Sequence, residues 1–199
     1  MFAMVAIAEG VGSLFFEGMW RLAWQINQGE LDYMLVRPYP MVLQVSSSQI
    51  GINGLSNIVT GGLMLGAALS HLDVDWSVGR IVLGLVMFPS AVVIKVSINL
   101  ATNAVSFWMP SPSPLFAMAV HQVGDLARFP LSVYPWALKA TLGFVLPFAF
   151  VSFFPVSYLV DGGTSAWAGL LTPLVAVYCL GAAGLVFSRG LRRYESAGN

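Results

Sequence analysis

The sequence predicts an all-α, polytopic membrane protein, and composition carries most of that prediction. Of the 199 residues, 57% are hydrophobic and only 9% are charged, whereas soluble domains carry about 25% charged residues. Charge-free runs long enough to cross the hydrocarbon core as helices, about 20 residues each, occupy positions 38–70, 96–124, 140–160 and 162–188. No alternation of polar and apolar residues, typical of a transmembrane β-strand, is visible. Helices are therefore expected, because backbone groups in lipid must bond within their own segment.

The predicted elements form one transmembrane domain over residues 1–199, with about five spans and an outer re-entrant hairpin. Residues 1–20 form a partial first helix ending near Arg21, and residues 21–45 form a cytoplasmic segment. The further spans are 47–69, 79–107, 115–128 and 163–187, the hairpin is 136–160, and the tail is 188–199.

Orientation follows from where lysine and arginine lie beside the spans. Arg21 and Arg37 flank the segment 21–45, and three arginines follow the last apolar run, so both places are assigned to the cytoplasm. The loop "SHLDVDWSVGR" then lies outside, and the proline-rich turn "WMPSPSP" inside. We expect a multi-pass protein of a bacterial cell membrane with a cytoplasmic C-terminus.

Residues 140–160 leave two topologies open. If 115–128 and 163–187 both span, 140–160 must re-enter from outside, and Pro147 and Pro155 would break it. If 115–128 instead lies flat on the inner side, 140–160 crosses. Both arrangements keep the terminal arginines in the cytoplasm.

Composition also limits the function classes. A net charge of zero gives no electrostatic basis for nucleic-acid binding. A phosphate loop needs Gly-Lys-Ser/Thr, but the only lysines follow Ile94 and Leu138. The two histidines form no H-E-x-x-H metal motif. The stretch "HQVGDL" is faintly similar to the glycine-aspartate motif of aspartyl intramembrane proteases, and we rank that function as the least favoured. We expect no enzymatic activity, metal or cofactor.

A charged island, "INQGELDYMLVRPYP", stands out between apolar runs. In the helix leading to it, Trp20 and Trp24 share one face while Arg21, Gln25 and Gln28 occupy another, which is an interfacial pattern. Gly29 is expected to end that helix, and "RPYP" to prevent another from continuing. From physics alone the island is either a solvated loop or a docking element.

The stretch "QGELDYMLVRPYP" resembles the cytoplasmic signature of type-two permease subunits of ATP-binding-cassette (ABC) transporters, in the subgroup that reads G-E-L-D-x-x-L-x-R-P. "RFPLSVYPWALKATLGFVLPFAFVSFFPVSYLV" and the terminal "GLRRYESAGN" agree in the same order. The family has another membrane helix before the segment that begins here, so the chain is expected to be N-terminally short.

The resemblance implies that the island docks on a separate ABC ATPase subunit. The coupling residues would be Gly29, Glu30, Leu31, Asp32, Arg37 and Pro38. It also implies export, a second permease copy or paralogue as partner, and the re-entrant topology. The hairpin residues would be Pro130, Tyr134, Pro135, Pro147 and Pro155. The competing function is a non-transporting membrane scaffold or assembly protein.

Two stripes of polar residues are expected to face each other between spans 47–69 and 79–107. Within each stripe the residues are spaced four apart, which puts them on one helix face. The stripes are Gln49, Asn53 and Asn57 on one span and Lys95, Asn99 and Asn103 on the other. They would either hydrogen-bond the helices together or line a water-filled vestibule. Lys95 could also meet Glu9 or Glu17 from the first helix.

Overall fold

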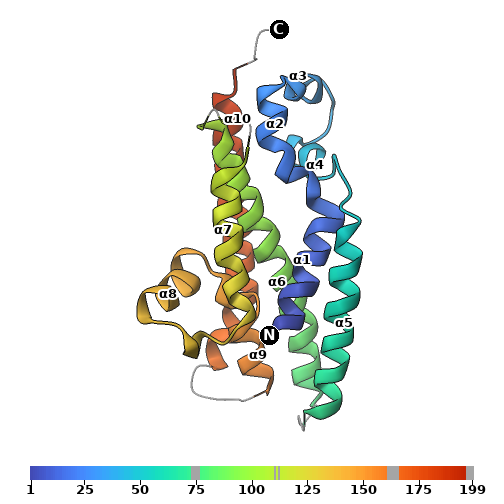
Figure 1. Ribbon diagram of the computed structural model, residues 1–199, viewed down its shortest axis with the longest axis vertical. Helices are drawn as coiled ribbons and strands as arrows, with labels where there is room; N and C mark the ends of the chain where they lie inside the picture. The colour runs from blue at the N-terminus through green and yellow to red at the C-terminus, as the bar shows by residue number, and fades with distance from the viewer. Residues whose placement is uncertain (73–76, 110, 112, 161–165, 196–199) are drawn as a thin grey trace.

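The structure is a computed structural model that describes residues 1–72, 77–109, 111, 113–160 and 166–195, and every regular element in those residues is helical. Figure 1 shows an elongated bundle with the C-terminus at one end. The four long helices that follow its long axis are α1 (Phe2–Phe16), α5 (Asn53–His71), α6 (Val78–Ala104) and α10 (Thr172–Arg193).

Short elements connect the long helices and cap the bundle. At the end near the C-terminus lie η1 (Glu17–Arg21), α2 (Leu22–Asn27), α3 (Glu30–Leu35), α4 (Met41–Ser46) and η2 (Val105–Phe107). The connection from α6 to α10 contains α7 (Leu115–Asp125), η3 (Leu126–Arg128), η4 (Leu131–Val133), α8 (Trp136–Ala140), the π-helical turn η5 (Thr141–Val145), η6 (Phe148–Phe150), α9 (Phe153–Val160) and η7 (Ala166–Leu171).

The helical membrane class is confirmed, whereas the predicted count of about five spans is not. Among the described residues, the segments long and apolar enough to cross a bilayer are Phe2–Asn27, Val78–Phe107 and Trp167–Arg193. The pair Trp136–Val145 and Phe148–Val160, bent by 75°, adds a fourth if it counts as one span. Helix α7 has 11 residues and so reaches only about 17 Å of a hydrocarbon core about 30 Å thick.

Several predicted boundaries are shifted. The first helix does not end near Arg21 but continues through η1 and α2 to Asn27. Helix α5 begins at Asn53, so residues 47–52 of the predicted span 47–69 are not part of it. Helix α10 extends past the predicted boundary at 187 to Arg193, and the predicted start at 163 lies outside the described residues. The acidic part of the predicted outer loop, 73–76, and the tail residues 196–199 also lie outside them.

Helix α1 packs between α5 and α6, which is the main departure from the predicted arrangement. Its contact with α5 is close because glycines meet there. A Cβ atom on Gly10 would lie 2.6 Å from the carbonyl oxygen of Gly54, and one on Gly61 would lie 2.6 Å from Cγ1 of Ile7. Because α1 fills this position, the predicted direct pairing of α5 with α6 is wrong. Helix α10 packs along α6 instead.

Two apolar clusters hold the bundle together. The first, near the hairpin, includes Met4, Ile94, Leu142, Phe148 and Val151. The second, near the C-terminal end, includes Leu22, Leu31, Leu100 and Phe187. The second cluster buries one residue of the charged island, so that island is attached to the bundle and is not a free loop.

Candidate functional site

The charged island forms a short helix held at a fixed angle. Gly29 has φ 69°, a left-handed conformation that glycine adopts without strain, and it separates α2 from α3. Helix α3 ends at Leu35, three residues before Pro38. The expected stop at Gly29 and the end of the helix before "RPYP" therefore agree with the structure.

Leu31 anchors α3 to the bundle. Its side chain is fully buried in the cluster that contains Leu100 of α6 and Phe187 of α10. Met34, one turn further along α3, packs against the same cluster. Helix α3 therefore packs on the same apolar cluster as the two long helices.

A polar contact joins α3 to the end of α10. Burial raises the pKa of the Tyr194 hydroxyl, and the neighbouring Asp32 carboxylate raises it further. Tyr194 directly follows the last residue of α10. Asp32 is thus partly engaged within the chain, and Leu31 and Asp32 together fix the inner side of α3.

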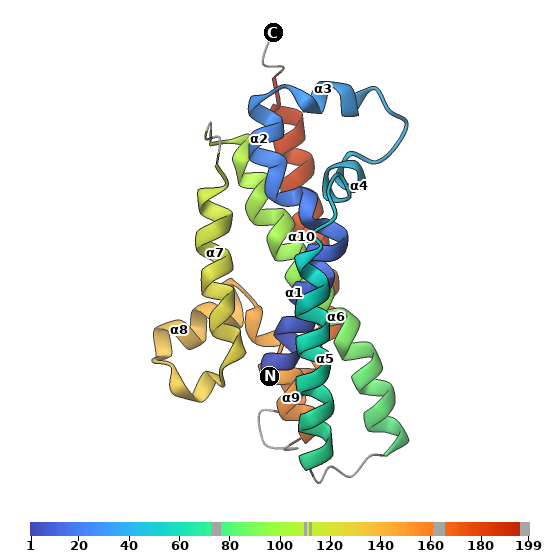
Figure 2. The same ribbon diagram turned by 45° about the vertical axis from the view of Figure 1, so that its right-hand side comes forward.

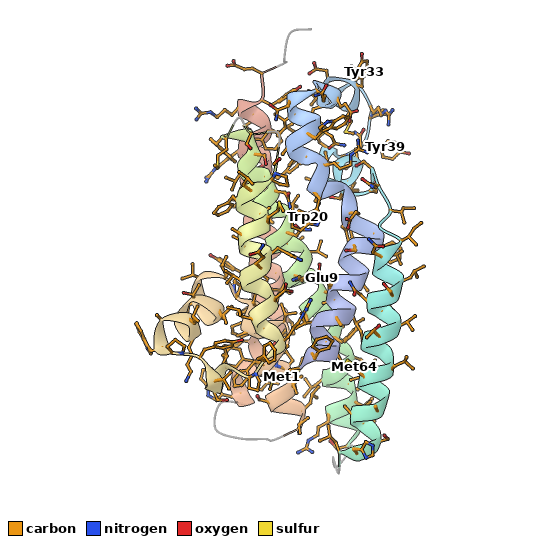
Figure 3. The ribbon with its side chains drawn as sticks, viewed as in Figure 1. Met1, Glu9, Trp20, Tyr33, Tyr39 and Met64 are labelled. Carbon is orange, nitrogen blue, oxygen red and sulfur yellow. The ribbon has the colours of Figure 1, made fainter. Side chains whose placement is uncertain are left out.

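The outer side of the island is exposed and aromatic. Tyr33, Val36 and Tyr39 have more than two thirds of their surface accessible, and Arg37 and Pro38 are exposed as well. Figure 3 shows Tyr33 and Tyr39 at the end of the molecule where the C-terminal helix finishes. Large aromatic side chains and arginine are the residue types enriched in protein interfaces.

Behind this face lies a polar cleft of about 440 Å³ between η1, α2, α3 and α4. Arg21, Arg37 and Glu30 line it, together with Gln25 and Gln44. Gln44 Nε2 donates to the carbonyl oxygens of Met34 (3.1 Å) and Tyr39 (2.9 Å), which ties the loop after α3 to α4.

One residue of the predicted interfacial pattern is misplaced. Gln25 was expected on a polar, water-facing side, but it is only 2% exposed, and its Nε2 donates to Ser48 Oγ at 3.3 Å. Trp24 is partly exposed, and the Arg21 guanidinium lies 4.7 Å from the centre of its ring. The helix face turns inward at Gln25 because α4 folds back against η1.

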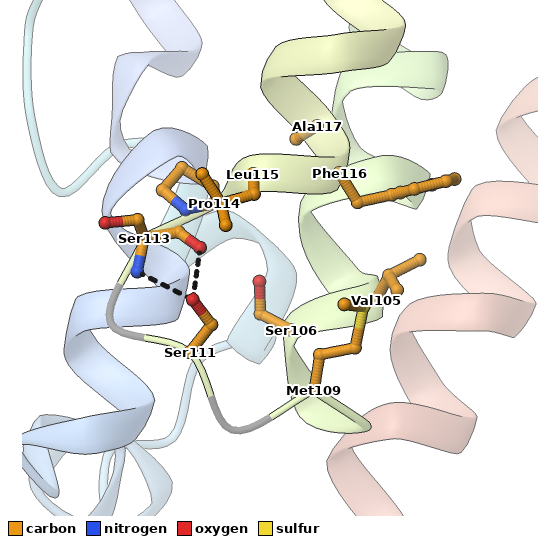
Figure 4. Close-up of a pocket in the computed structure, with 9 residues that line it drawn as sticks. All are labelled: Val105, Ser106, Met109, Ser111, Ser113, Pro114, Leu115, Phe116 and Ala117. Atoms are coloured by element: carbon orange, nitrogen blue, oxygen red, sulfur yellow. Dashed lines mark hydrogen bonds between the residues drawn. The ribbon is translucent and has the colours of Figure 1, made fainter.

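The turn between η2 and α7 lies at the same end. Figure 4 shows Ser111 Oγ donating to the carbonyl oxygen of Ser113 (3.1 Å) and accepting from its backbone N–H (3.4 Å). Asn27 Nδ2 donates to the Ser111 carbonyl at 3.1 Å and so links the turn to α2. The hollow beside it holds about 20 Å³, which is room for a water molecule but not for a larger ligand.

A second polar constellation lies inside the bundle. Glu9 of α1, about midway along the molecule in Figure 3, pairs with Lys95 of α6, with Nζ and Oε2 2.7 Å apart. Its other oxygen lies 3.5 Å from Nε2 of His121 on α7. Phe148 packs its ring 5.3 Å from the Lys95 ammonium, and Trp20 contacts His121 edge-on. One carboxylate thus joins three helices.

The six residues of the two predicted polar stripes lie in different environments. Lys95 is paired with Glu9, and Asn103 is fully buried, with its Nδ2 donating to the backbone oxygen (2.9 Å) and Oδ1 (2.7 Å) of Asn99. Asn53 is exposed and Asn57 half-buried on α5, while Gln49 lies before that helix begins. Helix α1 separates the two sets, so they do not face each other.

The hairpin residues shape the segment between α7 and α9. Pro147 lies at the 75° break, as expected. Pro155 was expected to break the segment too, but it is buried within the first turn of α9, where a missing N–H costs no helical hydrogen bond. Pro135 precedes α8, Pro130 precedes η4, and Tyr134 Oη donates to the Leu126 carbonyl at 2.9 Å.

Sequence reasoning missed His121 and Tyr194 as parts of these constellations. His121 carries no pattern of its own, because its partner Glu9 is more than a hundred positions away. The only signal in the sequence was Glu9 itself, because a carboxylate in an apolar helix needs a partner.

Comparison with known proteins agrees with this architecture. The family whose sequence profile matches is described as "ABC-2 family transporter protein", and the match covers residues 1–198. No curated protein and no solved structure is significantly similar to the chain. With nearly its whole length matched, the chain belongs to the ABC-2 transporter family.

Proposed function

We propose that this chain is the membrane-spanning permease subunit of an ATP-driven exporter. It forms the translocation pathway with a second permease, a copy or a paralogue, and a separate ATPase subunit hydrolyses ATP. The family match supports the permease role. The cytoplasmic side is the end that bears α3 and the arginines of α10, in agreement with the positive-inside rule.

The observation that carries the proposal is the two-sided character of Gly29–Pro38. Its inner side is fixed by Leu31 and by Asp32 beside Tyr194. Its outer side presents Tyr33 and Arg37 to a partner. A solvated loop needs neither feature, whereas a part that passes force from an ATPase to membrane helices needs both.

The coupling step would be a rigid-body movement. Closure of the ATPase subunits pushes on the outer side of α3, and Leu31 transmits the displacement to α6 and α10. Movements of one or two ångströms between packed helices are typical of such switches. The Gln44 hydrogen bonds to the carbonyl oxygens of Met34 and Tyr39 would hold the segment against α4, so that it does not absorb the push.

The pathway would be lined by the polar side of α5. Asn53, Ser56 and Thr60 are exposed on it, and Asn57 is half-buried beside them. Polar groups at membrane depth are costly against lipid, so this side would face water or the second permease. Lys95 would link α6 to Glu9 of α1, and Asn103 and Asn99, which bond to each other within α6, would not line the pathway either.

Asp32→Lys tests the coupling proposal in the complete transporter. Reversal of this charge removes the carboxylate that lies beside Tyr194 on the inner side of α3, so it should lower transport-coupled ATP hydrolysis roughly tenfold or more, the scale of one lost contact to a charged group. Glu195→Lys is the matched control, because it reverses an exposed charge at the same end outside the island. Unchanged coupling in Asp32→Lys would refute the proposal.

Co-purification separates a permease from a scaffold. Solubilised from its native membrane, a permease should retain an ATPase subunit and a second permease in a fixed ratio. A scaffold has no reason to bind a nucleotide-hydrolysing subunit, so a complex without one would favour the scaffold.

A further inference from the structure

A row of small cavities follows the seam between α6 and α7, and the proposed function does not use it. Figure 2 shows α7 beside the half of α6 that leads to the α3 end. The first cavity, drawn in Figure 4, holds about 20 Å³ beside Ser106 and Ala117. The second, beside Thr102, and the third, beside Trp20, hold about 10 Å³ each. Each volume is room for about one water molecule.

The three cavities share walls, so they form one row. Ala117 of α7 lines both the first and the second cavity. Lys95, Asn99 and His121 line both the second and the third. The polar side chains that α6 contributes are spaced three and four residues apart, which puts them on one face of the helix. From Lys95 to Ser106 the row is about 16 Å long, measured along the helix axis.

Hydrogen-bonding groups at the inner end of the row are left open by the chain. The Lys95 ammonium has three N–H donors, and its ion pair with Glu9 Oε2, 2.7 Å away, engages one of them. Beyond that ion pair, neither atom has a hydrogen-bond partner among the described residues. The second oxygen of Glu9 lies 3.5 Å from His121 Nε2, which is longer than a normal N–H···O bond. Such groups are the usual partners of buried water molecules.

The row stops at Lys95 because the apolar core begins there. Phe148, which lines the second cavity, belongs to the first apolar cluster. Ala91, one turn before Lys95 on α6, is 1% exposed and belongs to the same cluster. At its other end the row begins beside Ser111, whose carbonyl oxygen accepts from Asn27 of α2. The row therefore begins at the end of the bundle that bears α3.

We propose that a single file of water molecules enters the bundle along this seam from the α3 end and stops at the Lys95 ammonium. The walls offer hydroxyl, amide and imidazole groups to water as far as Lys95 and apolar groups beyond it. A lysine inside a membrane bundle is less costly when it meets water. The seam is separate from the polar side of α5, because α1 packs between α5 and α6. The buried ion pair is thereby reached by water from one end only.

The test follows Ag⁺, which is no larger than a water molecule, binds a thiolate, and is excluded from a dry apolar interior. Single cysteines are placed in the Cys179→Ser protein, which is held in lipid nanodiscs in chloride-free buffer. After a timed exposure Ag⁺ is removed by rapid desalting, and the thiol that is still free is alkylated under denaturing conditions and measured by mass spectrometry.

Thr102→Cys, in the second cavity, should bind Ag⁺ roughly tenfold faster or more than Ser97→Cys, because a thiol in a dry interior must wait for local opening of the fold. Ser97 is the matched control. It is a buried hydroxyl residue of the same helix, 1% exposed, and it lines none of the three cavities.

Ala117→Leu tests the route, because it narrows the passage between the first and the second cavity. It should slow Thr102→Cys to the rate of the control and leave Ser106→Cys fast. Ala119→Leu, on the exposed side of α7, should change neither rate. Should Ala117→Leu fail to fold, Ser106→Leu fills the first cavity from α6 and should also slow Thr102→Cys.

Ala91→Cys tests where the file ends, and it should react as slowly as Ser97→Cys. Equal rates for Thr102→Cys and Ser97→Cys would show that the seam is dry and would overturn the proposal. A fast Thr102→Cys that neither blocking variant slows would mean that water arrives from another direction, which overturns it as well, as does a fast Ala91→Cys. No nucleotide or ATPase takes part in these measurements, so the proposal and the proposed function fail independently.

Discussion

Lys95 and Glu9 form an ion pair inside the bundle, with Nζ and Oε2 2.7 Å apart and the lysine 5% exposed. The residues come from α6 and α1, which are separated by most of the first half of the sequence. Removal of one partner from a buried pair leaves an uncompensated charge in a medium of low polarity. The pair therefore ties α1 to α6.

Lys95→Met should destabilise the protein by about 3–5 kcal/mol, the usual cost of breaking a buried pair. Glu9→Gln should cost a similar amount, and the double variant less than the sum, because neither charge is then left alone. Thermal unfolding in detergent measures this as a fall in Tm of about 2–4 °C for each kcal/mol. Additive losses would show that the two groups do not interact.

The same variants separate two roles of the cluster. If Lys95 links helices, Lys95→Met should lower assembly and transport together. If it lines a water-filled vestibule, transport should be lost while assembly stays normal. Lys139→Met, on α8 outside the bundle centre, is the control for removal of a lysine.

Gly10→Ala should push α1 and α5 apart and destabilise the protein. The new Cβ atom would lie 2.6 Å from the Gly54 carbonyl oxygen and from Cγ1 of Ile58, and overpacking of this kind costs about 1–3 kcal/mol. Gly62→Ala, where nothing lies within 4 Å, should instead be neutral or slightly stabilising, since alanine favours a helix over glycine. Thermal unfolding of the two variants side by side checks the contrast, and equal effects would contradict the close packing.

Leu31→Ala should loosen the island while the bundle stays folded. The side chain is fully buried, and truncation of such a leucine costs about 2–5 kcal/mol. Amide hydrogen exchange over residues 29–38 should therefore accelerate roughly tenfold or more. Leu35→Ala, on the same helix but about half exposed, should leave exchange nearly unchanged. Equal protection in both variants would mean that Leu31 does not anchor α3.

Trp136→Cys in a Cys179→Ser background tests the topology of the hairpin. Trp136 is 82% exposed at the start of α8, so its cysteine should react quickly with a membrane-impermeant reagent added outside. Tyr134→Cys should react more slowly, because that residue is half-buried. Tyr33→Cys, on α3, should react only from the cytoplasmic side. Labelling of Trp136→Cys from the cytoplasm would favour a crossing segment at 140–160.

Local features of the fold were predictable because their causes are local. Gly29 ends a helix through its own backbone freedom, and Pro147 breaks the hairpin because it lacks an N–H. The span Val78–Phe107 follows from the largely apolar stretch on both sides of Lys95. Pro155 was misjudged because the effect of a proline depends on whether it falls in the first turn of a helix, and that boundary could not be read from the sequence.

The sequence alone indicated a membrane environment, since so few charged residues cannot cover a soluble surface. It also predicted where the island bends, through its own glycine and prolines. Which helices are neighbours was decided only by the tertiary structure. Asn57 and Lys95 match in depth along their helices, yet α1 lies between them because Gly10 and Gly54 allow close approach. The partner of Lys95 is therefore Glu9, since helix packing depends on the fit of whole surfaces and not on the spacing of polar residues along one chain.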